Sequence, residues 1–385
     1  MPDVSAPLRE IDPRPLAELT TLRAGATPLR MVEAMTRAEL IATMTQLWAD
    51  GEPWLVIGGG SNLLVGDEPF EGTVVLVRNQ GIERVPSARD GGVRLRIQAG
   101  HDWDDLVAYT VAEGLRGIEA MSGIPGTTGA APIQNIGAYG QEIVETLVEV
   151  ELLDEATGEV ETVSAAELEL GFRTSALKAH YGVGARRSGV IVSVTLELAE
   201  VGPGSFPVRG AQLRQALGLT PDAEVSLAWI RETVLATRAR KGMVLDDSDP
   251  DTHSAGSFFQ NAVVSASFAR TLPDECPRWP LSVEVDAVSV IPLESYDGVV
   301  PPPVSVQPDV KVSAAWLIEH AGLRKGFRLP RSRAALSSKH ALALTNRGGA
   351  TAGELAELAR YIQQRVQSEF GLLLQPEPVL VGVEL

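Results

Sequence analysis

The chain has 385 residues, of which 44% are hydrophobic and 22% are charged, a composition typical of a soluble globular protein with two or three domains. Its formal net charge of −17 disfavours a nucleic-acid partner, because such a partner requires a broad basic face. The single cysteine, Cys276, excludes an internal disulfide and a thiolate cluster, and five scattered histidines predict no metal site. A local basic pocket can still hold an anion, and the candidate side chains for it are Arg173, Lys178, Arg238, Arg240, Lys241, Lys311, Arg324 and Lys325.

The first twenty residues lack an apolar stretch of signal-peptide length and carry several acidic side chains. No run in the chain approaches the roughly 18 apolar residues of a membrane-spanning helix. We therefore expect a cytoplasmic protein with no membrane partner. Composition leaves the oligomeric state open, and we expect a monomer.

The N-terminal third alternates between helical and strand patterns, recognised by the spacing of apolar residues. Residues 93–99 alternate strictly between apolar and polar side chains, which predicts a strand with one buried face. The elements predicted before residue 115 are a helix over 36–49, strands over 54–57, 74–77 and 93–99, and a helix that Asp102 caps and Gly114 ends.

The rest of the chain also carries clear start and stop signals. Thr351 and Glu354 form a capping-box pair in front of an amphipathic helix that Gly371 closes. A proline-rich, weakly patterned segment between Asp274 and Asp309 indicates an extended insertion. The other elements predicted here are strands over 147–153, 159–163 and 190–198, a helix over 226–239, and a helix that Ser313 caps and Gly322 ends.

Two glycine-rich loops are the most informative features of the sequence. One reads GIPGTTGAAPIQNIGAYGQE over residues 123–142, and the other reads IGGGSNLLV over residues 57–65, directly after an apolar strand. Backbone without regular pairing has N–H groups free for a ligand, and glycine lets that backbone approach phosphate closely. The loops therefore predict a long cofactor held at its diphosphate, with a pair of plain surface loops as the alternative. Neither loop fits GxGxxG, so we do not expect a Rossmann fold.

The chain resembles the UDP-N-acetylenolpyruvoylglucosamine reductase (MurB) family over nearly its whole length. The resemblance begins in the two glycine-rich loops and continues through later blocks in the same order along the chain. These blocks are GFRTSALK at 171–178, AGSFFQN at 255–261, KVSAAWLIEHAG at 311–322, KHALALTN at 339–346 and QPEPVLVG at 375–382.

The resemblance implies an α+β fold with a two-part FAD-binding region, similar to that of vanillyl-alcohol oxidase (PCMH-like), and a C-terminal α+β substrate-binding domain. The implied divisions are FAD-binding subdomains over 1–80 and 81–225, a substrate-binding domain over 226–377, and a C-terminal strand over 378–385 that could return to the first subdomain. It further implies non-covalent FAD and NADPH as cofactors. The implied reaction reduces the UDP-sugar substrate UDP-N-acetylglucosamine-enolpyruvate to UDP-N-acetylmuramate, in peptidoglycan precursor synthesis.

Three residues match the family's catalytic positions. Arg173 in GFRTSALK matches an arginine that contacts the enolpyruvyl carboxylate. Arginine suits this contact because its planar guanidinium group can pair with both carboxylate oxygens and keeps its proton. Glu377 in QPEPV shares that task, and its apolar surroundings predict a raised carboxyl pKa. Ser257 in AGSFFQN matches the proton donor to the substrate carbon.

The resemblance also assigns residues to binding. The cofactor residues it implies are Gly58, Gly59, Gly60, Ser61, Asn62, Gly123, Ile124, Pro125, Gly126, Thr127, Thr128, Gln134, Asn135, Gly137, Ala138 and Tyr139. On the substrate side it implies Lys241, Asn261 and Lys311.

One departure concerns the grip on the substrate. Gly210 stands where the family's longer-loop class carries a tyrosine over the nucleotide diphosphate, and Arg209 is the candidate to replace that contact. The segment before Lys311 is also longer than in the family.

Two alternatives stay open at this point: a divergent FAD-dependent oxidoreductase of the same superfamily acting on another sugar-type substrate, or a non-catalytic flavin- or UDP-sugar-binding paralogue.

Overall fold

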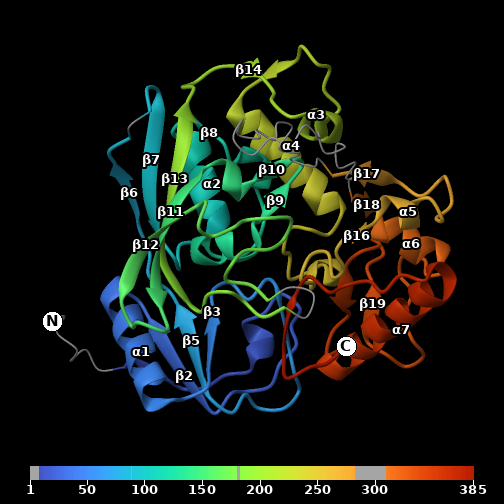
Figure 1. Cartoon of the computed structure of the whole chain (residues 1–385), viewed down its shortest axis with the longest axis horizontal. Coiled ribbons are helices and arrows are strands. Elements are labelled where there is room, and N and C mark those ends of the chain that lie inside the picture. Colours follow the sequence, from blue (N-terminus) through green and yellow to red (C-terminus); the bar gives the residue numbers. More distant parts are fainter. Residues whose placement is uncertain (1–7, 88, 180–182, 282–308) are drawn as a thin grey trace, which may run out of the picture.

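The computed structural model describes residues 8–87, 89–179, 183–281 and 309–385. Figure 1 shows the N-terminal elements in blue at the base of a large sheet, and the C-terminal helices in orange and red beside it. Most of the proline-rich segment predicted between Asp274 and Asp309, residues 282–308, lies outside the described residues. The mixture of helices and strands confirms the predicted α+β class.

The N-terminal part is a four-stranded sheet covered by one long helix. Its strand order is β1–β2–β5–β3, with the last three strands parallel. Thr36 caps the helix by accepting a hydrogen bond from the Glu39 N–H, and Gly51 ends it in a left-handed conformation. The elements are β1 (Glu10–Ile11), β2 (Arg30–Ala34), α1 (Arg37–Asp50), β3 (Trp54–Ile57) and β5 (Thr73–Val77), which confirms the predicted helix and both predicted strands.

The largest sheet is antiparallel and follows the order β12–β11–β13–β7–β6, with β8 added beside β13. Leu95 and Ile97 on β7 are fully buried, so the alternation predicted over residues 93–99 is confirmed. Asp102 caps α2 as predicted, by accepting from the N–H groups of Asp104 and Asp105. The elements are β6 (Ile82–Val85), β7 (Gly92–Gln98), α2 (Trp103–Ala112), β8 (Leu115–Arg116), β11 (Leu147–Asp154), β12 (Val160–Ser164) and β13 (Gly189–Glu200).

A small helical layer packs beside this sheet, near the top of the view in Figure 1. α4 packs against α2 and α3, and Ile230 and Val234 of α4 share a buried cluster with Leu213 of α3. The division predicted at residue 226 assigns α4 to the substrate-binding domain and stays a prediction. The elements are β14 (Phe206–Pro207), α3 (Ala211–Leu217), β15 (Glu224–Val225) and α4 (Leu227–Arg240).

The C-terminal part packs three described helices on short strands around a buried core, which Leu22, Ala24 and Leu64 of the N-terminal part also join. Thr351 and Glu354 form the predicted capping box, and Gly371 ends the helix in a left-handed conformation. The apolar stripe of α7 is buried, including Leu358 and Ile362. The elements are β16 (Ala262–Val264), α5 (Ala266–Ala269), β17 (Arg278–Pro280), β18 (Val310–Val312), α6 (Ala314–His320), β19 (Ala334–Leu336), β20 (Leu344–Asn346) and α7 (Ala352–Phe370).

The last strand returns to the N-terminal part. β21 (Val379–Val381) pairs in parallel with β4 (Leu63–Val65), the strand that follows the GGGSN loop. This pairing brings the QPEPV segment next to that loop. No helix among the described residues is both long and apolar enough to cross a membrane. The remaining elements are β9 (Gly137–Ala138), β10 (Gln141–Glu142) and the short 3₁₀ turns Leu16–Glu18, Glu119–Met121, Thr128–Ala130, Pro132–Gln134, Ile143–Glu145 and Pro250–Thr252.

Candidate active site

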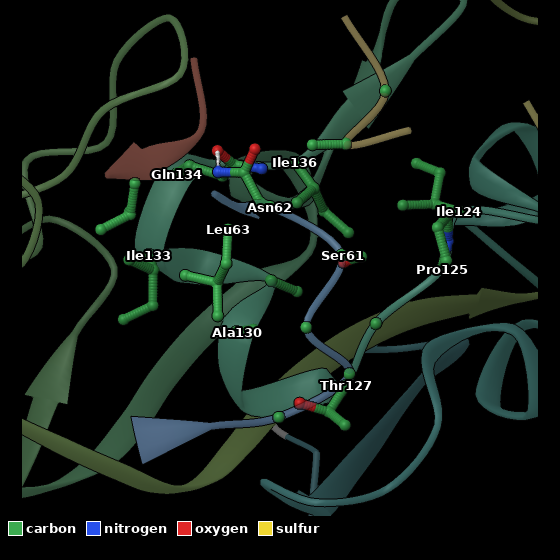
Figure 2. A pocket seen from close by; sticks show the side chains of 18 of the residues that line it. Ser61, Asn62, Leu63, Ile124, Pro125, Thr127, Ala130, Ile133, Gln134 and Ile136 are labelled. Carbon is green, nitrogen blue, oxygen red and sulfur yellow. Dashed lines mark hydrogen bonds between the residues drawn. The ribbon is translucent and has the colours of Figure 1, made fainter. Parts of the chain in front are cut away.

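A cavity of about 430 Å³ lies between the two glycine-rich loops and the C-terminal part of the chain. Figure 2 shows Ser61 and Asn62 of the first loop facing Ile124, Pro125 and Gln134 of the second. The AGSFFQN block and the QPEPV segment also contribute to its wall. The cavity therefore collects residues that are more than 300 positions apart in the sequence.

The two loops touch so closely that glycine is required at their contact. A Cβ atom on Gly59 would lie 2.6 Å from the Gly126 Cα, and one on Gly58 would lie 2.2 Å from the Thr127 Oγ1. Gly60 has a φ of +60°, and a Cβ there would lie 1.9 Å from the Leu19 carbonyl oxygen. Both the conformation and the space exclude larger residues, so the glycines of GGGSN shape one wall of the cavity.

These loops also leave backbone donors without partners. Within the described part of the chain, the N–H groups of residues 59–62, 126 and 127 donate no hydrogen bond. Adjacent free N–H groups favour an anion, and a diphosphate offers acceptors for several of them. The donor set therefore fits the diphosphate of FAD, and apolar residues such as Trp54 and Trp103 on the same wall fit its rings.

A partly buried polar network joins the loops to the C-terminal segment. The Asn62 Nδ2 donates to the Gln134 Oε1 at 2.6 Å and to the Glu377 carbonyl oxygen at 3.3 Å. The Lys178 Nζ donates to the same two oxygens, at 3.2 and 2.9 Å. Burial lowers the pKa of Lys178, which the Glu377 carboxylate opposes. Each donor thus bonds both acceptors, which fixes the position of Glu377 relative to the loops.

Arg173 is held in place by the second loop. Its Nη1 donates to the Asn135 carbonyl at 3.0 Å and its Nη2 to the Gly137 carbonyl at 2.8 Å. The Arg173 Nε lies 3.3 Å from the Glu377 Oε1. Arg173 has a φ of +56°, a conformation that is uncommon outside glycine and often marks a functional position.

Glu377 is enclosed on several sides. Its N–H donates to the Phe258 carbonyl at 2.8 Å, and its carboxyl group faces Arg173. Burial raises the pKa of Glu377, while the positive charges of Arg173 and Lys178 act in the opposite direction. The pKa of Glu377 is therefore shifted in the direction that the apolar runs around QPEPV predict.

Ser257 lies on the cavity wall between Gly256 and a pair of fully buried aromatic residues. Gly256 has a φ of +70°, and the Phe258 and Phe259 rings meet edge to face with centroids 5.2 Å apart. Because the Phe258 carbonyl accepts from the Glu377 N–H, the serine and glutamate segments run side by side. The structure therefore brings together all three residues assigned to catalysis around one cavity.

The residues assigned to the cofactor divide into two groups. Those that line the cavity are Gly58, Gly59, Gly60, Ser61, Asn62, Ile124, Pro125, Gly126, Thr127, Gln134 and Gly137. Those that do not line it are Gly123, Thr128, Asn135, Ala138 and Tyr139. The Thr128 N–H and hydroxyl both donate to the His101 carbonyl, and the Asn135 amide bonds Glu142 and the Gly171 carbonyl. These bonds hold the loop in shape, and cofactor contacts by the five residues stay predictions.

The residues assigned to the substrate lie outside the cavity wall. Lys311 places its Nζ 4.6 Å from the Phe172 ring centroid, and the Arg173 guanidinium lies 5.5 Å from the same centroid. The Asn261 Oδ1 accepts from the Ala314 N–H at 3.0 Å, at the start of α6. The remaining two are exposed: the Lys241 Nζ lies 5.8 Å from the Tyr139 ring centroid, and Arg209 precedes α3. Their contacts with substrate stay predictions.

Several residues of the cavity wall could not be assigned to the site from the sequence. Trp54 begins a predicted strand, Trp103 begins a predicted helix, and Met243 follows the RARKG block. Arg238 and Lys178 stood only in a pool of eight candidate basic residues. The spacing of Lys178 to Arg173 within GFRTSALK is the available local signal, whereas Arg238 is identified only by its position in the fold.

Comparison with known proteins agrees with this geometry. A model of the FAD binding domain matches residues 28–164. This match and the free backbone N–H groups that line the cavity define the chain as a flavoprotein. A model of the C-terminal domain of UDP-N-acetylenolpyruvoylglucosamine reductase matches residues 249–381. The two matches confirm the predicted combination of an FAD-binding region with a C-terminal domain of this kind.

Whole-chain relatives give the family. A UDP-N-acetylenolpyruvoylglucosamine reductase of Leifsonia xyli subsp. xyli is 52% identical over 97% of this chain and 100% of its own, and one of Thermobifida fusca is 45% identical over 96% and 98%. The crystal structure of the Thermus caldophilus enzyme (MurB) matches with a TM-score of 0.59 and 25% identity, over 97% of this chain and 99% of that one. The chain belongs to the UDP-N-acetylenolpyruvoylglucosamine reductase family.

Proposed function

We propose that the chain reduces UDP-N-acetylglucosamine-enolpyruvate to UDP-N-acetylmuramate with FAD and NADPH, a step of peptidoglycan precursor synthesis. The observation that carries this proposal is the meeting of Arg173, Ser257 and Glu377 at a cavity whose other wall offers free backbone donors for a diphosphate. FAD, when bound, supplies hydride transfer from NADPH to the substrate. The side chains that remain to be explained are those that handle charge and protons.

Hydride addition to the enolpyruvyl double bond builds negative charge on a carbon next to a carboxylate. Arg173 is a permanent cation fixed by two carbonyls, so it stabilises that charge without reorganising. Glu377 with a raised pKa keeps a proton and donates a hydrogen bond to the same carboxylate. The Ser257 hydroxyl then protonates the carbon, in a wall where Phe258 and Phe259 exclude water.

The remaining assignments belong to the same proposal. Lys241, Asn261, Lys311 and Arg209 bind the nucleotide and sugar side of the substrate. The FAD-binding subdomains cover 1–80 and 81–225, and the substrate-binding domain covers 226–377. The protein works as a cytoplasmic monomer. The non-catalytic alternative is disfavoured, because all three catalytic side chains are present and assembled.

Anaerobic absorption spectra test the proposed reaction directly. The purified protein should be yellow, lose its flavin absorbance when one equivalent of NADPH is added, and regain it when the enolpyruvyl UDP-sugar follows. The matched control adds a sugar or lactone, without NADPH, to the protein with oxidised flavin. Loss of flavin absorbance with that sugar, together with no recovery by the enolpyruvyl substrate after NADPH, would replace the proposed function by the divergent-oxidoreductase alternative.

We predict that FAD is bound without a covalent link. The cavity wall contains no cysteine or histidine among the described residues, so it offers no usual attachment side chain. Acid precipitation should therefore release the flavin into the supernatant, where its absorbance is compared with the total before precipitation. Flavin absorbance that stays in the washed protein pellet would contradict the prediction.

A further inference from the structure

Arg78 is a half-buried cation that lies behind the GGGSN loop. β3 and β5 are neighbouring parallel strands in which Ile57 pairs with Leu76, so their carboxyl ends meet at one edge of the sheet (Figure 1). Gly58 follows β3 at this edge, and Arg78 follows β5. The Arg78 Nη1 donates to the carbonyls of Gly58 and Val77, at 2.9 Å in both cases. The guanidinium group therefore holds the first peptide of the loop.

Carbonyl groups, and not a carboxylate, are the direct partners of this cation. In the described part of the chain Arg78 forms no ion pair, and the Glu33 carboxylate, whose charge reaches it, lies 3.8 Å from the Arg9 guanidinium. Burial lowers the pKa of Arg78, the Glu33 charge opposes this shift, and the Arg14 charge adds to it. A charged donor binds a carbonyl more strongly than a neutral one does, so the Gly58 carbonyl is held firmly.

The peptide between Gly58 and Gly59 carries a free donor on its opposite side. None of the described peptide bonds is cis, so the C=O and the N–H of this peptide point in opposite directions. Both glycines line the cavity and Arg78 does not, so the carbonyl faces back to Arg78 and the Gly59 N–H faces the cavity. That N–H donates no hydrogen bond within the described residues. Arg78 therefore sets the direction of one donor available to the diphosphate.

The two glycines do not fix this direction by themselves. Their close contacts with Gly126 and Thr127 require residues without a Cβ atom. Glycine backbone, however, allows either orientation of the peptide between Gly58 and Gly59. The reversed peptide would aim its carbonyl oxygen at the diphosphate, and the two negative groups would repel each other. The feature that lets the two loops touch therefore requires a restraint from outside the loop.

Resting on FAD as the cofactor of the proposed function, we propose that Arg78 is a positioning residue, which holds the Gly58–Gly59 peptide so that the Gly59 N–H donates to the diphosphate of FAD. Arg78 acts from behind the cavity wall, without touching the flavin ring. Its effect therefore belongs to the part of FAD that ADP also contains. Riboflavin carries the ring but no phosphate, so its binding is independent of Arg78.

Binding measurements on the apoprotein of the full chain test this role with three ligands. Arg78→Gln should weaken the binding of FAD and of ADP about tenfold, the effect of losing one bond to a charged group. The affinity for riboflavin should stay unchanged. Arg78→Lys keeps the charge and a donor, and should recover most of the lost affinity. Arg84→Gln removes an exposed charge from β6 and should change none of the three affinities.

The three ligands separate the possible results. If Arg78→Gln weakened the binding of FAD, ADP and riboflavin by the same factor, the cause would be a disturbed cavity, and the proposal would be overturned. Unchanged affinities for FAD and ADP would overturn it as well. A wild-type protein that binds neither FAD nor ADP would instead defeat the proposed function.

Nuclear magnetic resonance can observe the peptide itself. In protein made with glycine that carries ¹⁵N and a ¹³C carbonyl, a carbonyl-to-amide correlation spectrum records only glycines that follow another glycine. In this sequence these are Gly59, Gly60, Gly92 and Gly349. Saturating ADP should move the Gly59 amide proton downfield and leave Gly92 and Gly349, which do not line the cavity, in place. In Arg78→Gln the movement at saturation should be smaller, because the peptide then samples both orientations.

The wild-type spectrum covers the case in which Arg78→Gln fails to fold. A Gly59 amide proton that saturating ADP leaves in place would overturn the proposal, whatever the variant does. If the variant folds and binds ADP more weakly, but its Gly59 signal moves as far as in wild type, Arg78 acts through its charge alone. That result would overturn the positioning role as well.

Discussion

Ser257→Ala is expected to slow reoxidation of the reduced flavin by the enolpyruvyl substrate by about 10²–10⁴-fold, because positioned proton transfer contributes a factor of that size. Reduction of the flavin by NADPH should stay near the wild-type rate, since that step needs no proton at the substrate carbon. Anaerobic stopped-flow absorbance at the flavin band measures the two steps separately. Both rates are read from the absorbance of the same bound flavin, and the serine lies on the wall of the cavity proposed to hold it.

The control for this variant is Ser267→Ala, which removes an exposed hydroxyl from α5. It should change neither rate. If Ser257→Ala slowed both steps by the same factor, the loss would come from a disturbed cavity, and Ser257 would not be the proton donor.

Glu377→Gln is expected to lower the rate of the substrate step by about 10²–10³-fold, the usual loss when one donor to a developing negative charge is removed. In the wild-type protein that step should also slow as pH rises, because the raised pKa of Glu377 delays its ionisation and the neutral form is the donor. The alkaline decline should be absent from the variant. A decline of equal size in both proteins would contradict this role for the glutamate.

The same substitution has a signature in stability. A carboxyl group whose pKa is raised by folding stabilises the native state below its unfolded pKa, and that stability is lost as pH rises through the folded value. Glutamine has no such dependence. The melting temperature of Glu377→Gln relative to wild type should therefore increase from acidic to neutral pH, whereas Glu357→Gln on the exposed face of α7 should show no such trend.

Local signals explain why most of the regular structure could be predicted. Asp102 and Thr351 cap their helices through bonds that span two or three residues, so the cap and the helix are visible in the same short stretch. The buried face of residues 93–99 follows from alternation alone. Such elements depend on neighbours in the sequence and need no knowledge of the fold.

The wall of the cavity depends on contacts between distant segments, which limits prediction from sequence. Ala138 and Tyr139 belong to the predicted loop, but in the β9–β10 hairpin only Gly137 lines the cavity. Arg238 lines the cavity only because α4 packs on α2 beside Gly123. The catalytic residues could be predicted because their sequence blocks resemble a known family, whereas periodicity and composition assign them no role.

The parallel pairing of β21 with β4 couples two parts of the cavity wall that are far apart in the sequence. Glu377 lies two residues before β21, and the GGGSN loop leads directly into β4. A substitution that weakens this strand pair therefore displaces the carboxyl group and the loop relative to each other, although it changes neither of them.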